Sequence, residues 1–264
     1  MPSLPLHRGN KADRGADAVG GSMTDGGTGI CTGTAIEPGL VVDVAVPVLG
    51  VDGCPGGWVG ALVRPGRQLT WRFWSIEQTA DLLNAAAVVA VDMPIGLPEA
   101  GRRACDGQAR ARLGSARSSV FPVPSRSVLD VENYAAACTL ARARAEPAPS
   151  KQLWGLRPRI RALDVLMTPE TQARVVECHP EVAFLELLGA RPASKRSAVG
   201  VGQRMAGLGL SGNALAAAPL QAGTDDALDA LACAWTAARW SQGRADVLGD
   251  DQRDQRGLRM QIVA

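Results

Sequence analysis

The chain has 264 residues, of which 46% are apolar, and this is enough to fill the core of one large domain or two small ones. Its formal net charge of +2 is too small to be the footprint of a nucleic-acid-binding protein, so a basic binding surface must come from local clustering. No apolar run reaches the roughly 18 residues that a membrane helix needs, and six cysteines without a CxxC pair fit neither a zinc finger nor a disulfide scaffold. We therefore expect a folded, cytoplasmic protein with no membrane partner.

The two ends of the chain differ from its middle. Residues 1–44 are rich in Gly, Ala, Thr and Asp without a sustained apolar period, which predicts a disordered N-terminal arm in which Met23 is a candidate start. Residues 243–264 are charged and weakly patterned, which predicts a C-terminal tail. The folded domain is expected over residues 45–242, and both ends are expected to be dispensable to the chemistry.

Three strands open the predicted domain. The run "VPVLGVD" (46–52) is apolar and β-branched, which is typical of a strand buried on both faces. "WVGALVRPG" (58–66) follows and ends in a Pro-Gly turn, and "QLTWRFWS" (68–75) alternates apolar and polar residues. The short spacings predict antiparallel hairpins.

A helix and a fourth strand come next. "SIEQTADLLNAA" (75–86) has a Ser75 cap with Gln78 three residues later, and its apolar residues recur at helical spacing. "AVVAVDMP" (87–94) is a buried strand that Pro94 ends. A helical crossover favours parallel pairing between this strand and an earlier one.

This order gives Asp52 and Asp92 equivalent positions, each just after an apolar strand. If the two strands are parallel neighbours, both carboxylates emerge at the edge where open α/β sheets carry their sites. Two carboxylates about 4 Å apart repel by about 4 kcal/mol at an effective dielectric near 20, so the pair should share a proton or bind a cation. For either residue alone, a turn or a cap is the competing interpretation.

Further acidic candidates lie near the end of the domain. In "TDDALDALACAWTAARW" (224–240), Asp226 and Asp229 are three residues apart and so lie on one side of a helix that Thr224 is expected to cap. Asp229 is surrounded by Ala and Leu, where an acid without a role is unexpected. Glu177 ends another short strand in "RVVECHP" (174–180), and His179 beside it is assigned a structural or orienting role because no GxSxG elbow is present.

Cations for a phosphate backbone are expected in an insertion over about residues 95–165. Its segment 102–126 holds six arginines against one aspartate, and such a segment beside an acidic site can guide a nucleic acid. A solvated helix face is the alternative. The candidate substrate-binding residues are Arg102, Arg103, Arg110, Arg117, Arg126 and Lys151.

Several motifs together resemble the domain of unknown function 429 family, regarded as predicted nucleases of the ribonuclease-H-like superfamily. They are "GVDGCPGGW", "VDMPIGLPEAGRRACDGQAR", "SSVFPVPSR", "ECHPEVAF" and "DDALDALACAWTA", and the likeness runs from about residue 48 to 240. The resemblance implies an α/β fold with a mixed five-stranded sheet of order 3-2-1-4-5, flanked by helices. It also implies that Asp52, Asp92 and Asp226 or Asp229 hold two divalent ions, Mg²⁺ or Mn²⁺.

The expected function is therefore a metal-dependent nuclease that hydrolyses phosphodiester bonds by a two-metal-ion mechanism. In this mechanism Asp52 bridges the ions, Asp92 completes one site and Asp229 with Asp226 the other, while Glu177 holds a water or acts near the nucleophile. The first alternative is a non-catalytic nucleic-acid or ligand binding module. The second is an actin-like or sugar-kinase-type ATP-binding phosphotransferase, but such folds need a second Asp-Gly phosphate loop that we do not find in the sequence.

Overall fold

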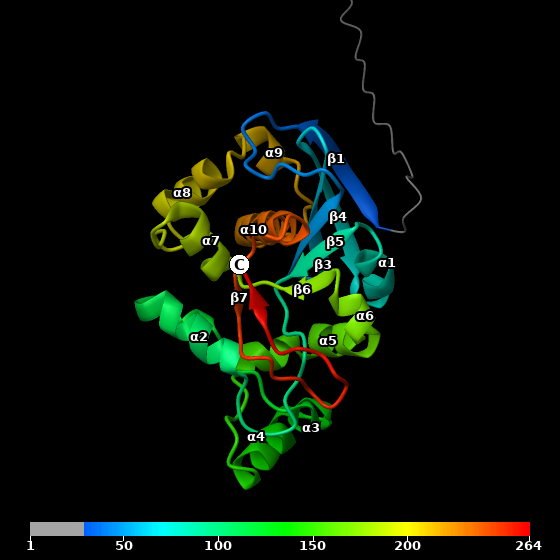
Figure 1. Ribbon diagram of the computed structural model, residues 1–264, viewed down its shortest axis with the longest axis vertical. Coiled ribbons are helices and arrows are strands. Elements are labelled where there is room, and N and C mark those ends of the chain that lie inside the picture. Colours follow the sequence, from blue (N-terminus) through cyan, green and yellow to red (C-terminus); the bar gives the residue numbers. More distant parts are fainter. Residues whose placement is uncertain (1–28) are drawn as a thin grey trace, which may run out of the picture.

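The fold is built on a six-stranded mixed sheet, whose strands Figure 1 shows beside the long helix α10 (Thr224–Ser241). The computed structural model describes residues 29–264. The strands are β1 (Ile30–Ile36), β2 (Val48–Cys54), β3 (Gly57–Arg64), β4 (Gln68–Ser75), β5 (Val88–Val91) and β6 (Val175–Glu177). Their order in the sheet is β1-β4-β3-β2-β5-β6, with β1 to β4 joined by antiparallel pairs and β2, β5 and β6 by parallel pairs.

The expectation of five strands is wrong because residues 30–36, assigned to the disordered arm, add a sixth strand. β1 pairs with β4 over Ile30↔Phe73 to Ile36↔Gln68, and Ile30 and Ile36 are exposed at this edge of the sheet. A strand with so little buried apolar surface has no alternating pattern to reveal it. Residues 1–28 of the expected arm, with Met23, lie outside the described residues.

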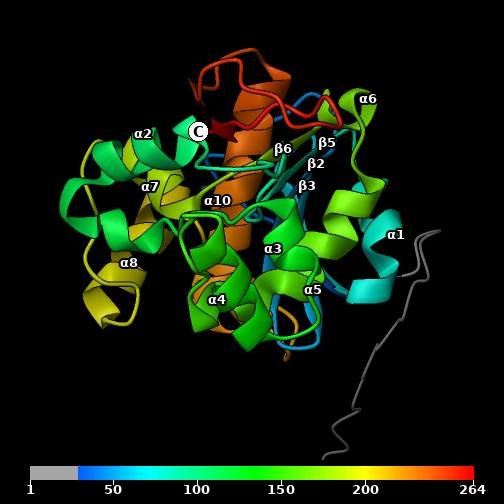
Figure 2. The same ribbon diagram turned by 90° about the horizontal axis from the view of Figure 1, so that it is seen from below.

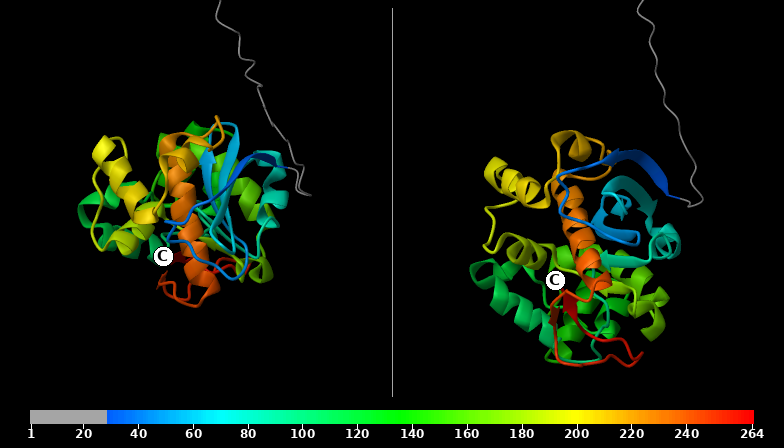
Figure 3. Two further views of the ribbon diagram at one scale, coloured as in Figure 1. Left: turned by 90° about the horizontal axis from the view of Figure 1, so that it is seen from above. Right: turned by 45° about the horizontal axis from the view of Figure 1, so that its top comes forward.

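Helices cover both faces of the sheet. In chain order they are η1 (Ile76–Gln78), α1 (Thr79–Leu83), α2 (Ala104–Leu113), η2 (Gly114–Ser119), α3 (Arg126–Asp130), α4 (Tyr134–Ala143), α5 (Lys151–Leu166), α6 (Pro169–Gln172), α7 (Pro180–Leu188), α8 (Ala198–Leu208), α9 (Gly212–Ala216) and α10 (Thr224–Ser241). Figure 3 shows α10 (orange) between the sheet and the helices α7 and α8 (yellow). The opposite face packs against α1 and α5.

The pleat of the sheet decides which core each strand residue joins. On β2, Val48 packs on the α10 side, whereas Leu49 and Val51 pack on the α1 and α5 side. On β5, Ala90 lies on the α10 side and Val91 on the other. Since side chains alternate along a strand, Asp52 and Asp92 both emerge on the α10 side.

The segment between β5 and β6 contains α2 to α6 and corresponds to the expected insertion. Part of it has a small core of its own, in which Val128 of α3 packs with Ala137 and Ala141 of α4 and with Trp154 of α5. Figure 2 shows α3, α4 and α5 together, with α2 near α7 on the other side of α10. Within residues 29–264, no helix has the length and hydropathy to cross a bilayer.

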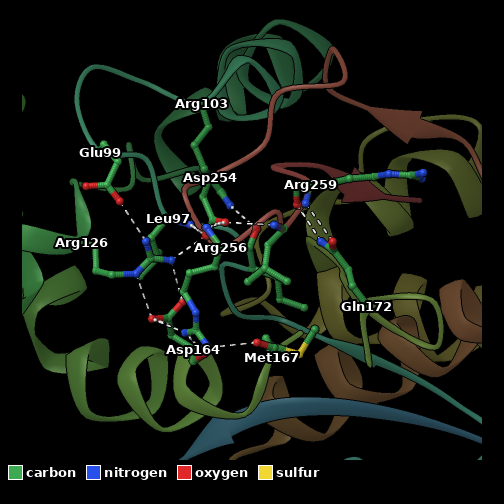
Figure 4. A network of polar contacts seen from close by, with 12 residues as sticks. Leu97, Glu99, Arg103, Arg126, Asp164, Met167, Gln172, Asp254, Arg256 and Arg259 are labelled. Carbon is green, nitrogen blue, oxygen red and sulfur yellow. Dashed lines mark hydrogen bonds and ion pairs between the residues drawn. The ribbon is translucent and has the colours of Figure 1, made fainter. Parts of the chain in front are cut away.

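Residues 243–264 do not form a separate tail. Leu258, Ile262 and Val263 are buried, and β7 (Val247–Leu248) pairs with β8 (Ile262–Val263) in a small second sheet. Asp254 is fixed by Arg126 and by the backbone N–H groups of Leu97 and Leu258, as Figure 4 shows for the surrounding network. The sequence of this segment looks like that of an exposed tail because it is rich in charged residues. Some of these residues, such as Asp254 and Arg256, form ion pairs with Arg126 and Asp164 of the insertion.

Candidate functional site

The approach of α10 to β2 begins with a glycine. A Cβ atom on Gly50 would lie 2.0 Å from both the carbonyl oxygen of Ala230 and the amide nitrogen of Ala234, so only a glycine allows this contact. The face of α10 that lies on the sheet is made mostly of alanines, which also keep the two backbones close. Asp229, one residue before Ala230, is thereby carried to the end of β2 that bears Asp52.

Three carboxylates meet at this point. β2 and β5 are parallel neighbours, so Asp52 and Asp92 emerge at the same edge, and the amide of Asp92 donates to the carbonyl of Val51 at 2.9 Å. Burial, followed by the charges of Asp92 and Asp229, raises the pKa of Asp52 well above its ordinary value. Burial and the charge of Asp229 likewise raise the pKa of Asp92. The structure therefore brings together Asp52, Asp92 and Asp229.

The third carboxylate is shared between a cation and the cluster. Burial raises the pKa of Asp229 to about 6, although the ammonium of Lys195 opposes this shift. Lys195 Nζ donates to Asp229 Oδ2 at 2.8 Å and lies 3.6 Å from Asp225 Oδ2. The other oxygen, Asp229 Oδ1, is buried and has no hydrogen-bond partner in the described part of the chain.

Asp226 lies in the first turn of α10, as expected, but the residue that caps this helix differs. The helix N-cap is Gly223 and not Thr224, and the amide of Gly223 donates to Asp226 Oδ2 at 2.9 Å. Asp226 therefore satisfies a free N–H group at the start of α10, where a negative charge also complements the helix dipole. Its charge still raises the pKa of Asp52, so it contributes to the field of the cluster.

A cleft of about 740 Å³ opens over the cluster. Its walls include residues of β2, β6 and α10, the segment 92–94 after β5, the segment 116–123 and the segment 191–196. Besides the three aspartates, the lining includes Phe121 and His179. His179 Nε2 lies 3.4 Å from the carbonyl of Ser119, and burial lowers its pKa, so a neutral ring that orients this wall fits the contact.

Glu177 lines the cleft but its oxygens are occupied. Arg103 donates to both of them at 2.7 Å, and the amide of Ile95 donates to Oε2 at 2.7 Å. Glu177 pairs with Val91 in the sheet register and so projects from the opposite face to Asp92. The expected role at the nucleophile does not follow from this geometry, which instead makes Glu177 an anchor for the loop after β5.

Of the six described residues that were expected to bind phosphates, Arg103 alone lines the cleft, and Glu177 and Asp106 engage it. Arg110 donates to the carbonyls of Arg117 and Val120 and shapes the turn after α2. Arg126 pairs with Glu99, Asp164 and Asp254 (Figure 4). The remaining three, Arg102, Arg117 and Lys151, are exposed and lie outside the cleft lining.

The cations beside the cleft come from a segment that the sequence analysis missed. Arg191, Lys195 and Arg196 lie between α7 and α8 and line the opening. Arg191 Nη1 reaches across to Ser115 Oγ at 2.5 Å. The signal in the sequence is weak, because "ARPASKRSA" has only three cations among small residues and no regular spacing.

The donor set fits a hard divalent cation in its chemistry. Carboxylate oxygens are the ligands that Mg²⁺ prefers, and Asp229 Oδ1 is a buried acceptor without a partner. Repulsion among buried carboxylates is also relieved by a cation. Among residues 29–264, however, no three His, Cys, Asp or Glu side chains are already arranged around one point as ligands, so the cluster would have to close on an ion.

Comparison with known proteins gives one match. A family model described as "Protein of unknown function (DUF429)" matches residues 50–254, which include the three aspartates and most of the cleft. Neither the curated proteins nor the solved structures provide a significant match.

Proposed function

The chain belongs to this family of proteins of unknown function, DUF429, and on that premise we propose that it is a metal-dependent nuclease with a ribonuclease-H-like fold. The observation that carries the proposal is the meeting of Asp52, Asp92 and Asp229 at the floor of a cleft with a basic rim. The antiparallel strands β4, β3 and β2, followed by the parallel strands β5 and β6, support the fold assignment.

The three aspartates would hold Mg²⁺ or Mn²⁺, and such an ion supplies charge neutralisation at a phosphoryl group and a more acidic water. The charges of Asp92, Asp229 and Asp226 all act on the pKa of Asp52, so we make Asp52 the central ligand of the proposal. Asp226 and Glu177 act by position, since Asp226 caps α10 and Glu177 fixes the loop after β5 through Ile95.

The rim of the cleft supports a polyanionic substrate. Arg191, Lys195 and Arg196 place positive charge beside the carboxylates, and a cleft focuses the field of the charges that line it. Phosphate contacts of this kind position a nucleic acid without reading its sequence. The proposed substrate class is therefore DNA or RNA, bound through its backbone.

A second candidate is a non-catalytic binding module with the same fold. It is favoured by one observation, that no three ligand side chains in residues 29–264 are already arranged around a point. Such a module would bind a nucleic acid at the basic rim without cleaving it.

Cleavage assays separate the two candidates. Single-stranded, double-stranded, branched and hybrid substrates would be incubated with Mg²⁺, with Mn²⁺ or with EDTA. We expect cleavage in the presence of a divalent ion by the wild-type protein and by Asp250→Asn, which alters an exposed aspartate, but not by Asp52→Asn. Binding without cleavage of any substrate favours the binding module, and equal cleavage by Asp52→Asn excludes the proposed centre.

A further inference from the structure

In the described part of the chain, Lys195 is the cation that directly contacts the acidic cluster. Its ammonium lies 2.8 Å from Asp229 Oδ2 and 3.6 Å from Asp225 Oδ2, and its charge also acts on Asp52 and Asp92. This contact uses one oxygen of Asp229. Asp229 is only 4% exposed, and its second oxygen, Oδ1, is buried and has no hydrogen-bond partner in residues 29–264.

The segment that carries Lys195 is held in place by α8. The amide of Ala193 donates to Gln203 Oε1 at 2.7 Å, and Arg204 Nη1 donates to the carbonyl of Ala193 at 2.7 Å. Arg204 is only 1% exposed, and its other Nη donates to Glu181 Oε1 at 2.6 Å. Lys195 thus follows a stretch of backbone whose amide and carbonyl at Ala193 are both held by side chains of α8.

A close approach of backbones fixes the other side of Lys195. A Cβ atom on Gly200 would lie 2.1 Å from the carbonyl oxygen of Ser194, so the first turn of α8 packs directly on the residue before Lys195. Ser197 caps α8 through the amide of Gly200 and also donates to the carbonyl of Ser194 at 2.8 Å. The backbone from which Lys195 extends is therefore fixed by α8, and the ion pair with Asp229 holds the ammonium at the cluster.

We propose that Lys195 takes the place of one of the two cations expected for this site, so that the protein binds a single divalent ion. The ion would use Asp52, Asp92 and the unpartnered Oδ1 of Asp229, while the ammonium neutralises Oδ2 and Asp225. A second divalent ion on Oδ2 would meet the ammonium at contact distance, and like charges repel strongly there. The inference rests on the proposed function only for the presence of a divalent ion.

The charges that face the ammonium come from several elements. Asp225 and Asp229 lie on α10, Asp52 follows the buried part of β2, and the charge of Asp92 at the end of β5 also interacts with it. Arg159 of α5 lies near the hairpin that β2 and β3 form, but its guanidinium donates to the carbonyls of Cys54 and Gly57 in that hairpin. Arg204 and Glu181 also act on Asp229, but they pair with each other at 2.6 Å. Among residues 29–264, Lys195 is therefore the cation in direct contact with the cluster.

The number of bound Mn²⁺ ions tests the proposal, measured by electron paramagnetic resonance of free Mn²⁺ during titration. We expect one ion per chain for the wild type, for Lys195→Arg and for Arg196→Met, the last removing a neighbouring exposed charge. Lys195→Met is expected to bind two ions, or one ion at least about 10-fold more tightly, because the competing ammonium is gone. Lys195→Gln, which keeps a donor for Asp229, provides the same comparison if Lys195→Met does not fold.

Two ions in the wild type, no ion in the wild type, or equal binding by Lys195→Met and Arg196→Met would each overturn the assignment. The readout is separate from cleavage. One bound ion without cleavage of any substrate supports the role of Lys195 and refutes the nuclease, whereas two bound ions with cleavage refute the role of Lys195 and support the nuclease.

Discussion

At Asp52, burial and the charges of its neighbours act in the same direction. Both disfavour the ionised carboxylate, and the hydrogen bond from the amide of Gly53 at 2.7 Å opposes them only in part. Without a cation, the ionised cluster is therefore costly to the folded state. This cost is the physical link between the site and the stability of the protein.

The pH dependence of unfolding in EDTA follows from this cost. The folded-state pKa of Asp52 lies above the ordinary value of 3.8, so above pH 4 the folded protein holds more protons than the unfolded chain. Stability then falls as the pH rises, and Asp229 adds to the fall up to its pKa of about 6. In urea titrations from pH 4 to 7, Asp52→Asn should lose less stability than the wild type, and parallel curves would contradict this.

Glu177 gives the second prediction for a single residue. Removing one partner of a buried ion pair costs about 3–5 kcal/mol, so Glu177→Ala should lower the free energy of unfolding by this amount. Glu132→Ala removes an exposed carboxylate and should stay within about 0.5 kcal/mol of the wild type. Urea unfolding measures both. A stable Glu177→Ala protein that has lost cleavage would restore the role at the nucleophile.

Residue patterns locate the aspartates better than they assign roles. The rule that strand ends carry sites brings Asp52 and Asp92 together, and an acid among alanines points to Asp229. The same rule selects Glu177, which projects from the opposite face to Asp92. The face on which a residue projects depends on strand register, and register is a property of the paired strands. Arg103 pairs with Glu177 and Lys195 pairs with Asp229. No local sequence pattern predicts these pairs, because their members are far apart in the sequence.

At the level of elements, the site depends on how closely α10 lies on β2. Gly50→Ala places a methyl group against the backbone of α10 and should destabilise the protein by about 1–3 kcal/mol or more, because a packed core resists insertion. Gly107→Ala in α2, where a Cβ meets nothing within 4 Å, should be neutral or stabilising by up to about 1 kcal/mol. Thermal and urea unfolding compare the two, and equal effects would contradict the close contact.

The segment between α7 and α8 gives a prediction for binding. Arg196→Ala should weaken binding of a nucleic acid without regard to its sequence and reduce the salt slope of the affinity by about 1, since one phosphate contact is lost. Arg102→Ala removes an exposed arginine outside the cleft lining and should leave the slope unchanged. Fluorescence anisotropy at several salt concentrations measures both slopes. A larger change for Arg102→Ala than for Arg196→Ala would indicate that the nucleic acid binds at the segment 102–126 instead.

Strands and helices with strong periodicity were predictable, whereas elements whose stability is tertiary were not. β2 to β6 and α10 carry apolar patterns of their own. β1 is held by its pairing with β4, and its residues are mostly exposed, so its sequence reads as a flexible segment. The last residues are a second case, because Leu258 and Ile262 find their partners only when α2, α5 and β6 are in place.

For the whole molecule, the segment after α10 joins the insertion to the sheet. Asp254 belongs to this segment and accepts hydrogen bonds from the side chain of Arg126 and from the amides of Leu97, Arg256 and Leu258 (Figure 4). Arg126 in turn contacts Asp164 of α5. A single carboxylate thus couples three parts of the chain that are far apart in sequence.

Asp254→Ala should therefore lower the free energy of unfolding by about 3–5 kcal/mol, because it leaves Arg126 and two buried N–H groups without this partner. Asp250→Ala, at an exposed position of the same segment, should have little effect. Chemical unfolding of both variants makes the comparison. Equal stability would show that the segment is dispensable to the fold, as its sequence alone predicts.

The most direct test of the nuclease is the origin of the oxygen in its product. Hydrolysis breaks one P–O ester bond, places the oxygen of water on phosphorus and leaves a proton with the departing alcohol. With Mn²⁺ in ¹⁸O-labelled water, the wild type should yield phosphate ends that each carry one ¹⁸O by mass spectrometry, and Asp52→Asn should reduce their yield at least about 100-fold. Unlabelled ends, no product, or the same yield from Asp52→Asn would contradict hydrolysis at this centre.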